Sequence, residues 1–300
     1  MSSDVKLSLG PLLFNWPNGK VRDFYARIAD EAPVDTVHLG EVVCAKRAPA
    51  REAVWGPVVE RLETAGKEVI LSTQALILSS DEMKAIRRRI ADPKRVYEAN
   101  DVAVADMLRE RPHVIGPLVN VYNEGTLATL AERGAFRVCL PPEMPGKSIA
   151  VLAKTGLAEI EVLVFGRLPL AIAARCYHAR AHGLTKEDCR FVCANDPDGM
   201  EVDTLDGRPF LAINGTQTLS YATANLAAEI PGLRAMGVNR FRLSPHAVDM
   251  VRIATRFRGV AEGTIDPAEV LAETEGLIDG APNANGFFHN AEGLRYVTGE

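Results

Sequence analysis

The sequence predicts an α/β protein: a (β/α) barrel-like, mostly parallel sheet with a cysteine-rich insertion. Up to Phe165, apolar runs of strand length alternate with segments of helical periodicity. Such alternation implies parallel strands joined by helical crossovers. A length of 300 residues suits one barrel, which needs about 250. The turn Asn15-Trp16-Pro17-Asn18-Gly19 lacks the glycine pattern of a dinucleotide-binding sheet, so a closed barrel is favoured over an open one.

Each element of this regular part follows from its own pattern. In the first helix, Val21, Tyr25 and Ile28 share one face, and Ser79 is placed to cap a helix from Ser80. The expected strands are 7–14, 36–40, 68–73, 95–98, 114–121, 136–140 and 160–165. The expected helices are 18–31, 51–65, 80–90, 102–109, 125–133 and 147–154.

The pattern changes after Phe165. Residues 166–195 are predicted to be an irregular, cysteine-rich insertion within a single barrel-like domain that spans 1–300. Residues 200–219 resemble antiparallel strands with a turn at Asp206-Gly207. Helix and strand are expected to resume over 221–235, 240–244 and 248–258.

Composition and hydropathy argue against two classes of protein. The net charge of −5 disfavours nucleic-acid binding, which usually needs a basic excess. The sequence contains no run of 18 apolar residues, so no membrane span is predicted. The first residues also lack a basic leader, and we therefore expect a cytoplasmic protein. In that compartment the five cysteines should not form disulfides, which favours metal binding or catalysis.

Four of the cysteines are predicted to form one site. Cys176, Cys189 and Cys193 lie within 18 residues, and Cys44 follows the expected strand 36–40. Both segments come after the carboxyl ends of parallel strands, where barrels build their active sites, so we expect them to meet. Cys139 lies inside the expected strand 136–140 and is predicted to be a buried core residue.

The spacing of these thiols leaves three interpretations open. Four thiolates can hold a cubane iron–sulfur cluster or a structural zinc, and the cysteines could also be unrelated buried or reactive thiols. Zinc ribbons usually have two short cysteine pairs, and this chain has one. Asp196 stands where the Cys-x3-Cys-x2-Cys pattern of radical enzymes needs a third cysteine.

Charged residues near the thiols have two possible roles. They could compensate a bound anion and lower the pKa of cysteine, or they could only solvate an exposed loop. Among them, His178 lies two residues after Cys176 and could move protons, but it is predicted to be an exposed loop histidine. Glu41 and Arg47 flank Cys44 and could orient groups around the sulfurs or simply pair with each other. The basic residues of the insertion are Arg175, His178, Arg180, His182, Lys186 and Arg190.

Several of these segments together resemble the ubiquinone-biosynthesis members of the collagenase-like peptidase family. The likeness covers nearly the whole chain. The matching segments are Leu9-Gly10-Pro11-Leu12-Leu13-Phe14-Asn15-Trp16-Pro17, Gly40-Glu41-Val42-Val43-Cys44-Ala45-Lys46-Arg47, Gly166-Arg167-Leu168-Pro169-Leu170-Ala171, Ala174-Arg175-Cys176, Asp188-Cys189 to Cys193, Asn214-Gly215-Thr216-Gln217-Thr218 and Asn285-Gly286-Phe287.

The resemblance implies a [4Fe-4S] cluster on Cys44, Cys176, Cys189 and Cys193. It also implies a heterodimer with a homologous UbiU-like subunit. The pair would act on a quinone precursor, in the oxygen-independent (anaerobic) hydroxylation of the ubiquinone ring. Alternatively, the cluster is structural or electron-carrying and supports a catalytic partner, or the chain is a peptidase-like hydrolase. No serine–histidine elbow or His-Glu-x-x-His helix supports a hydrolase, and no residue is assigned a catalytic role.

Overall fold

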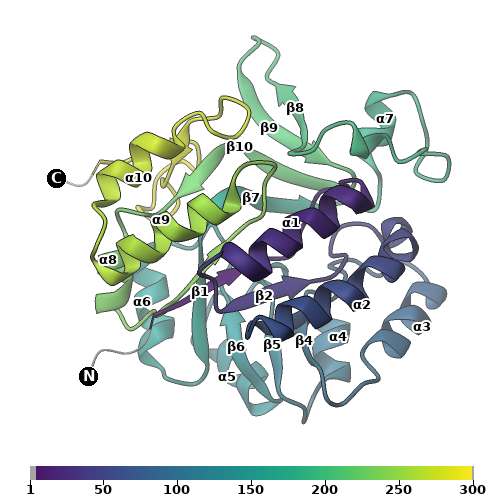
Figure 1. The fold of residues 1–300 in the computed structure, drawn as a ribbon, viewed down its shortest axis with the longest axis horizontal. Coiled ribbons are helices and arrows are strands. Elements are labelled where there is room, and N and C mark those ends of the chain that lie inside the picture. Colours follow the sequence, from purple (N-terminus) through teal and green to yellow (C-terminus); the bar gives the residue numbers. More distant parts are fainter. Residues whose placement is uncertain (1–4, 299–300) are drawn as a thin grey trace.

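The computed structural model describes residues 5–298, and this part of the chain contains a closed barrel of parallel strands (Figure 1). The barrel closes because β11 pairs in parallel with both β1 and β7. The predicted α/β barrel is therefore confirmed. The barrel strands are β1 (Lys6–Leu9), β2 (Thr36–Leu39), β3 (Glu68–Ser72), β4 (Val96–Ala99), β5 (His113–Ile115), β6 (Ala135–Cys139), β7 (Glu159–Ile172) and β11 (Arg240–Leu243).

Helices connect the strands on the outside of the barrel (Figure 1). Local sequence signals correctly predicted where α1 and α3 begin. The first helix has the predicted bounds, and the Ser79 side chain accepts a hydrogen bond from the amide of Glu82 at the start of α3. The helices are α1 (Asn18–Glu31), α2 (Ala48–Thr64), α3 (Ser80–Arg89), α4 (Val102–Met107), α5 (Glu124–Glu132), α6 (Gly146–Lys154), α8 (Ile230–Ala235), α9 (Met250–Glu262) and α10 (Pro267–Thr274), and the short 3₁₀ turns are η1 (Ala45–Arg47) and η2 (Pro117–Val119).

Two strands are shorter than predicted, and proline accounts for both differences. The strand expected over 7–14 ends at Leu9, and the one expected over 114–121 ends at Ile115. Pro11 and Pro117 follow these ends and have no backbone N–H to donate to a neighbouring strand. At the carboxyl end of the barrel the first run continues as a buried loop over 10–14, and the second continues as a partly buried 3₁₀ turn over 117–119.

The seventh strand is longer than predicted. The expectation that the chain becomes irregular at residue 166 is wrong for 166–172, because β7 continues through Ile172 and pairs there with β10 in antiparallel register. Gly166 has φ +119°, and a Cβ atom at this position would lie 2.6 Å from Cβ of Ser244. Glycine therefore lets the strand leave the barrel without a break.

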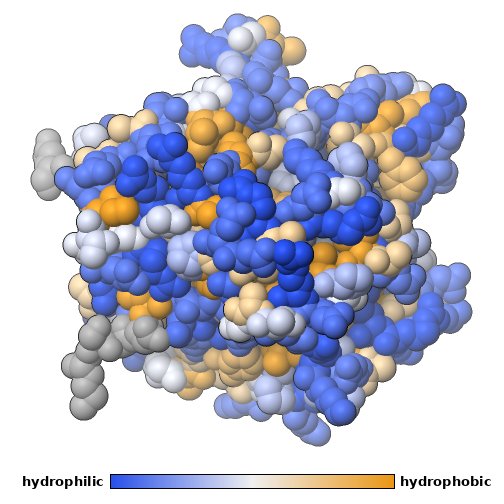
Figure 2. All heavy atoms as spheres, viewed as in Figure 1, coloured by the Kyte–Doolittle hydropathy of each residue, from blue (hydrophilic) through white to orange (hydrophobic). Residues whose placement is uncertain are grey.

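The carboxyl half of β7 carries a second, smaller group of strands. The antiparallel strands expected over 200–219 are confirmed, and in Figure 1 the hairpin of β8 and β9 projects from the body of the molecule. Figure 2 shows that this projection is largely hydrophilic. The elements added here are α7 (Tyr177–Ala181), η3 (Val192–Ala194), β8 (Met200–Asp203), β9 (Pro209–Asn214), β10 (Gln217–Asn225) and β12 (Asn283–Ala284).

The interior of the barrel contains ion pairs as well as apolar side chains. Arg242 lies 2.6 Å from Glu98 and 2.5 Å from Glu161, and all three side chains are buried. His38 Nδ1 lies 3.3 Å from Glu98. Buried charges of this kind are stable only when paired, so the barrel fixes the positions of these side chains tightly. Between residues 5 and 298, no helix is both long and apolar enough to cross a membrane.

Candidate functional site

Cys44, Cys176, Cys189 and Cys193 line one cavity at the carboxyl end of the barrel. They come from three segments: the loop after β2, the start of α7 and the loop between α7 and β8. Cys139 is fully buried in β6 and does not line this cavity. Over residues 5–298, no three His, Cys, Asp or Glu side chains converge closely enough to hold one metal ion.

The loop that carries Cys44 is held by a buried carboxylate. One oxygen of Glu41 accepts hydrogen bonds from the backbone amides of Cys44 at 2.9 Å and Val43 at 3.1 Å. Glu41 also lies 4.0 Å from Arg47, so both of the residues that flank Cys44 are part of its surroundings. These two hydrogen bonds to one carboxylate fix the conformation of the loop at Cys44.

Cys176 caps the first turn of α7. Its Sγ accepts a hydrogen bond from the amide of Ala179 at 3.4 Å. His178, predicted to be exposed, is instead fully buried, and its Nε2 lies 2.8 Å from Asp196. This pair joins α7 to the residues after Cys193, which explains the burial of a histidine that sequence alone places on a loop.

The chain between Cys189 and Cys193 turns sharply. Arg190 has φ +47° and Phe191 has φ +54°, a left-handed conformation that is unfavourable for bulky residues. Such backbone strain concentrates at functional sites. Here it lets Cys189 and Cys193 face the same cavity. Nδ2 of Asn15, from the loop after β1, lies 3.5 Å from Sγ of Cys193.

Lys46 and Lys186 join the loop that carries Cys44 to the part of the chain that carries the other three cysteines. Nζ of Lys46 donates to the backbone oxygens of Lys186 and Glu187, at 2.7 Å in both cases. Nζ of Lys186 in turn donates to the backbone oxygen of Ala174 at 3.0 Å. Contacts between residues about 140 positions apart along the chain therefore bring Cys44 to the other three thiols.

The basic groups around the thiols are only partly those expected. Lys186 lines the cavity, whereas Arg175, Arg180 and Arg190 are exposed and do not. Lys46 and Arg47 line it instead. A sequence signal for them existed, because both lie within three residues of Cys44 in the chain.

The four cysteine thiols are buried or partly buried and the Arg47 guanidinium is buried, so the charge that each carries depends on the charged groups close to it. Burial raises the pKa of Cys44 and of Cys176, and Arg47 opposes the rise in both. Burial alone would lower the pKa of Arg47, but Glu41 and the sulfurs of Cys193 and Cys44 raise it overall. A guanidinium that stays charged here favours thiolates, the form of cysteine that binds metals.

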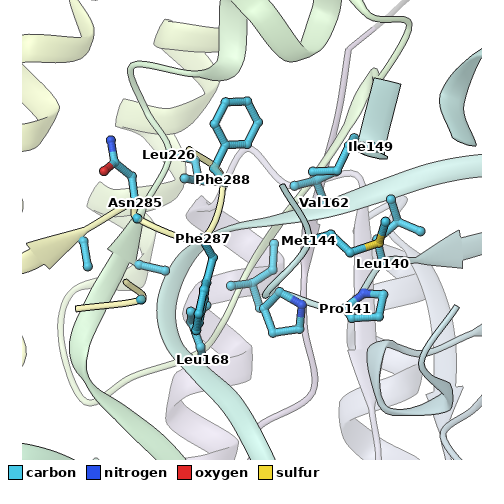
Figure 3. A pocket seen from close by; sticks show the side chains of 16 residues that line it. Leu140, Pro141, Met144, Ile149, Val162, Leu168, Leu226, Asn285, Phe287 and Phe288 are labelled. Carbon is cyan, nitrogen blue, oxygen red and sulfur yellow. The ribbon is translucent and has the colours of Figure 1, made fainter. Parts of the chain in front are cut away.

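A second, apolar recess lies beside β6 and β7 (Figure 3). Phe287 and Phe288, which follow β12, line it together with Met144 and Leu168. The amide of Asn285 holds the segment after β12 by hydrogen bonds to Glu229 at 2.7 Å and to the backbone oxygen of Val297 at 2.9 Å. This segment does not reach the cysteine cavity.

Comparison with known proteins identifies a family. Among solved structures, the chain is similar to the U32 peptidase Mk0906, with 13% identity and a TM-score of 0.46 over 82% of this chain and 95% of that one. It is also similar to dihydropteroate synthase (FolP) from Thermus thermophilus, with 14% identity and a TM-score of 0.43 over 88% and 95% of the two chains. Likenesses this weak carry no argument about function. The profile of Peptidase family U32 matches residues 19–281, which is most of the sequence, and on this match the chain belongs to Peptidase family U32.

Proposed function

We propose that the chain is a UbiV-like iron–sulfur subunit that works with a UbiU-like partner in the oxygen-independent hydroxylation of the ubiquinone ring. The observation that carries the proposal is the meeting of Cys44, Cys176, Cys189 and Cys193 around one cavity with Lys46, Arg47 and Lys186. Thiols brought from distant segments into a basic cavity are the donor set that an iron–sulfur cluster uses.

The residues present fit a cubane cluster. Each cysteine of a [4Fe-4S] cluster binds a different iron, so four thiols can serve it without converging on a single point. Arg47 is buried, and its Nε finds no hydrogen-bond partner among the residues that the structure describes. The guanidinium also lies 4.0 Å from Glu41, and a buried cation with one free donor beside Cys44 and Cys193 suits an anionic group in the cavity.

The chain's own side chains would have distinct roles around the cluster. The four cysteines would bind it, Glu41 orients the loop that carries Cys44, and Arg47 with Lys46 and Lys186 would offset its negative charge. When bound, such a cluster supplies single-electron transfer. Four cysteines on four irons leave no open position, which favours electron transfer over direct binding of substrate.

Metal analysis tests the cofactor. Protein purified without oxygen should contain about four irons and four sulfides per chain. Replacement of Cys44, Cys176, Cys189 or Cys193 by serine should remove most of the iron, and Cys139→Ser is the matched control that should not. Stoichiometric zinc without labile sulfide would refute the proposal.

A genetic experiment tests the role in quinone synthesis. In a ubiquinone-producing bacterium, deletion of the gene should stop anaerobic but not aerobic quinone synthesis. Complementation with the Cys189→Ser variant should fail. Equal loss with and without oxygen, or restoration by the variant, would contradict the proposal.

The partner can be tested separately. Tyr177 and Phe191, which neighbour Cys176 and Cys189, are 47% and 41% exposed. A subunit that covered them would shield the cluster from solvent and oxidation. Co-expression with a UbiU-like subunit should therefore slow the loss of iron in air. An unchanged rate of loss would count against the heterodimer.

Membership of a peptidase family makes hydrolysis the second candidate. It predicts cleavage of peptides by the purified chain, and such cleavage should survive Cys189→Ser. Peptide cleavage that is independent of iron would favour this candidate.

A further inference from the structure

A narrow recess opens at the carboxyl end of the barrel, separate from the cysteine cavity. Its lining comes from the segments that follow β1, β2, β4, β5 and β11, together with side chains from β7, β10 and β11. The walls are mainly apolar and include Leu13, Val42, Leu118 and Leu163. The recess has a volume of about 30 Å³. It lies where barrel enzymes bind their substrates.

Gln217, the first residue of β10, lines this recess and has an unused hydrogen-bond donor. Arg47 can only donate hydrogen bonds, and its NH2 lies 2.9 Å from Oδ1 of Asn214. This bond fixes the Asn214 amide so that its Nδ2 donates to Oε1 of Gln217 at 3.2 Å. Nε2 of Gln217 is then left over. It is buried, and within the described part of the chain it has no hydrogen-bond partner.

The charges beneath the recess disfavour an anionic ligand. Arg242 lines the recess but is paired with Glu98 and Glu161. Arg242 holds the pKa of Glu98 well below its usual range and lowers that of Glu161 to about 2, against the effect of burial. Both carboxylates are therefore ionised at neutral pH. Even with His38 protonated, this group would carry no net positive charge.

We propose that this recess is a binding site for a neutral ring whose oxygen accepts a hydrogen bond from Nε2 of Gln217. The volume admits the oxygen-bearing edge of the ring, and the rest would lie against the half-buried Leu118. A buried donor without a partner is unfavourable, and an acceptor oxygen removes that cost. The inference that the ring is a quinone precursor rests on the proposed function, whereas the site itself does not.

The same contacts connect the recess to the cysteine cavity. Arg47 lines the cavity and binds Asn214, and Asn214 binds Gln217 at the recess. Three side chains thus lead from the thiols to the proposed ligand oxygen. Gln217 is accordingly the residue that would contact the ligand, and Asn214 and Arg47 are the residues that position it.

Binding of small probes to the full chain tests the site. Anisole carries an acceptor oxygen, toluene has a similar shape without one, and benzoate adds a negative charge. At neutral pH, ligand-observed NMR should show anisole binding about three- to tenfold more tightly than toluene, the range expected for one hydrogen bond. Benzoate should bind more weakly than anisole.

Two variants locate the effect. Gln217→Glu keeps the acceptor for Asn214 but removes the donor, so the preference for anisole over toluene should disappear. Gln74→Glu changes a buried glutamine that does not line the recess, and the preference should remain. If Gln217→Glu does not fold, Gln217→Leu serves, and the preference should disappear there too.

These measurements distinguish failure of the recess proposal from failure of the cluster proposal. An unchanged anisole preference in the folded Gln217 variant, tighter binding of benzoate than of anisole, or no binding of anisole would overturn the recess site. Iron content is measured on the same samples and should equal that of the wild type in Gln217→Glu. A wild-type chain without iron would refute the cluster proposal, and the ratio of anisole to toluene affinity would still test the recess.

Discussion

The guanidinium of Arg47 donates a hydrogen bond to Oδ1 of Asn214 at 2.9 Å, which joins the loop after β2 to the end of β9. The next residue, Gly215, has φ +64°, and a Cβ atom there would lie 2.6 Å from NH2 of Arg47. The backbone can approach the guanidinium so closely only because this position is glycine. Arg47 therefore supports both the cysteine cavity and the neighbouring barrel mouth.

Arg47→Met should weaken cluster retention. The change removes a buried positive charge beside Cys44 and Cys193 and leaves the amide of Asn214 without its donor. We expect several-fold faster loss of iron, measured by absorbance during exposure to a chelator without oxygen. Arg175→Met alters an exposed arginine next to Cys176 and is the control. Equal rates of iron loss in the two variants would show that Arg47 does not stabilise the cluster.

Arg242→Met should destabilise the barrel. The change leaves Glu98 and Glu161 buried without their cation, and the loss of one partner of a buried pair typically lowers the free energy of unfolding by about 3–5 kcal/mol. Urea unfolding followed by circular dichroism measures this. Arg256→Met removes a partly exposed partner of Glu273 and should cost less than about 1 kcal/mol. A similar small effect for Arg242→Met would contradict the prediction.

Acid should weaken the same group of side chains. Burial opposes ionisation of Glu161, yet Arg242 and His38 lower the pKa of Glu161 from 4.5 to about 2. A carboxylate with a lowered pKa contributes stability above its unfolded pKa and loses it as the pH falls through the folded pKa. Stability should therefore decline between about pH 5 and pH 2, by up to about 3 kcal/mol from this residue.

Urea midpoints measured across that range test the pH dependence. Glu161→Gln should flatten the curve, although it also lowers stability at neutral pH because it removes a partner of Arg242. Glu132→Gln changes an exposed residue of α5 and should leave the slope unchanged. Parallel curves for the wild type and Glu161→Gln would show that another group causes the decline.

Gly166→Ala should disturb the point at which β7 leaves the barrel. The added Cβ would lie 2.6 Å from Ser244 and 3.0 Å from His246, at φ +119°. We expect a loss of about 2 kcal/mol or more in the free energy of unfolding. Gly156 also has a positive φ, +65°, but in Gly156→Ala the added Cβ would meet no atom of residues 5–298 within 4 Å. A comparable loss in both would show that the backbone conformation alone, and not the close contact, sets the cost.

Local pattern predicted the barrel because each strand and helix is specified by residues near it in the chain. Apolar periodicity and the cap at Ser79 placed α1 and α3 to within a residue. Two strands end earlier than predicted because Pro11 and Pro117 follow them, which is a local cause. The prediction also failed for β7, and there the cause was pairing at a distance. The regular pattern ends at Phe165, but β10 supplies partners that carry β7 through Ile172.

The sequence by itself determined the alternating pattern of the barrel and the set of four cysteines placed after its strands. Only the tertiary structure decided that Lys46 and Arg47, and not Arg175 or Arg180, line the cysteine cavity. It alone placed Asn214 between Arg47 and Gln217, residues 167 and 3 positions away from it in the chain. The physical reason is that periodicity in the sequence indicates only which face of a helix or strand is buried. Which side chains meet at the mouth of the barrel depends on closure of the sheet, because closure brings together the ends of strands that are far apart in the sequence.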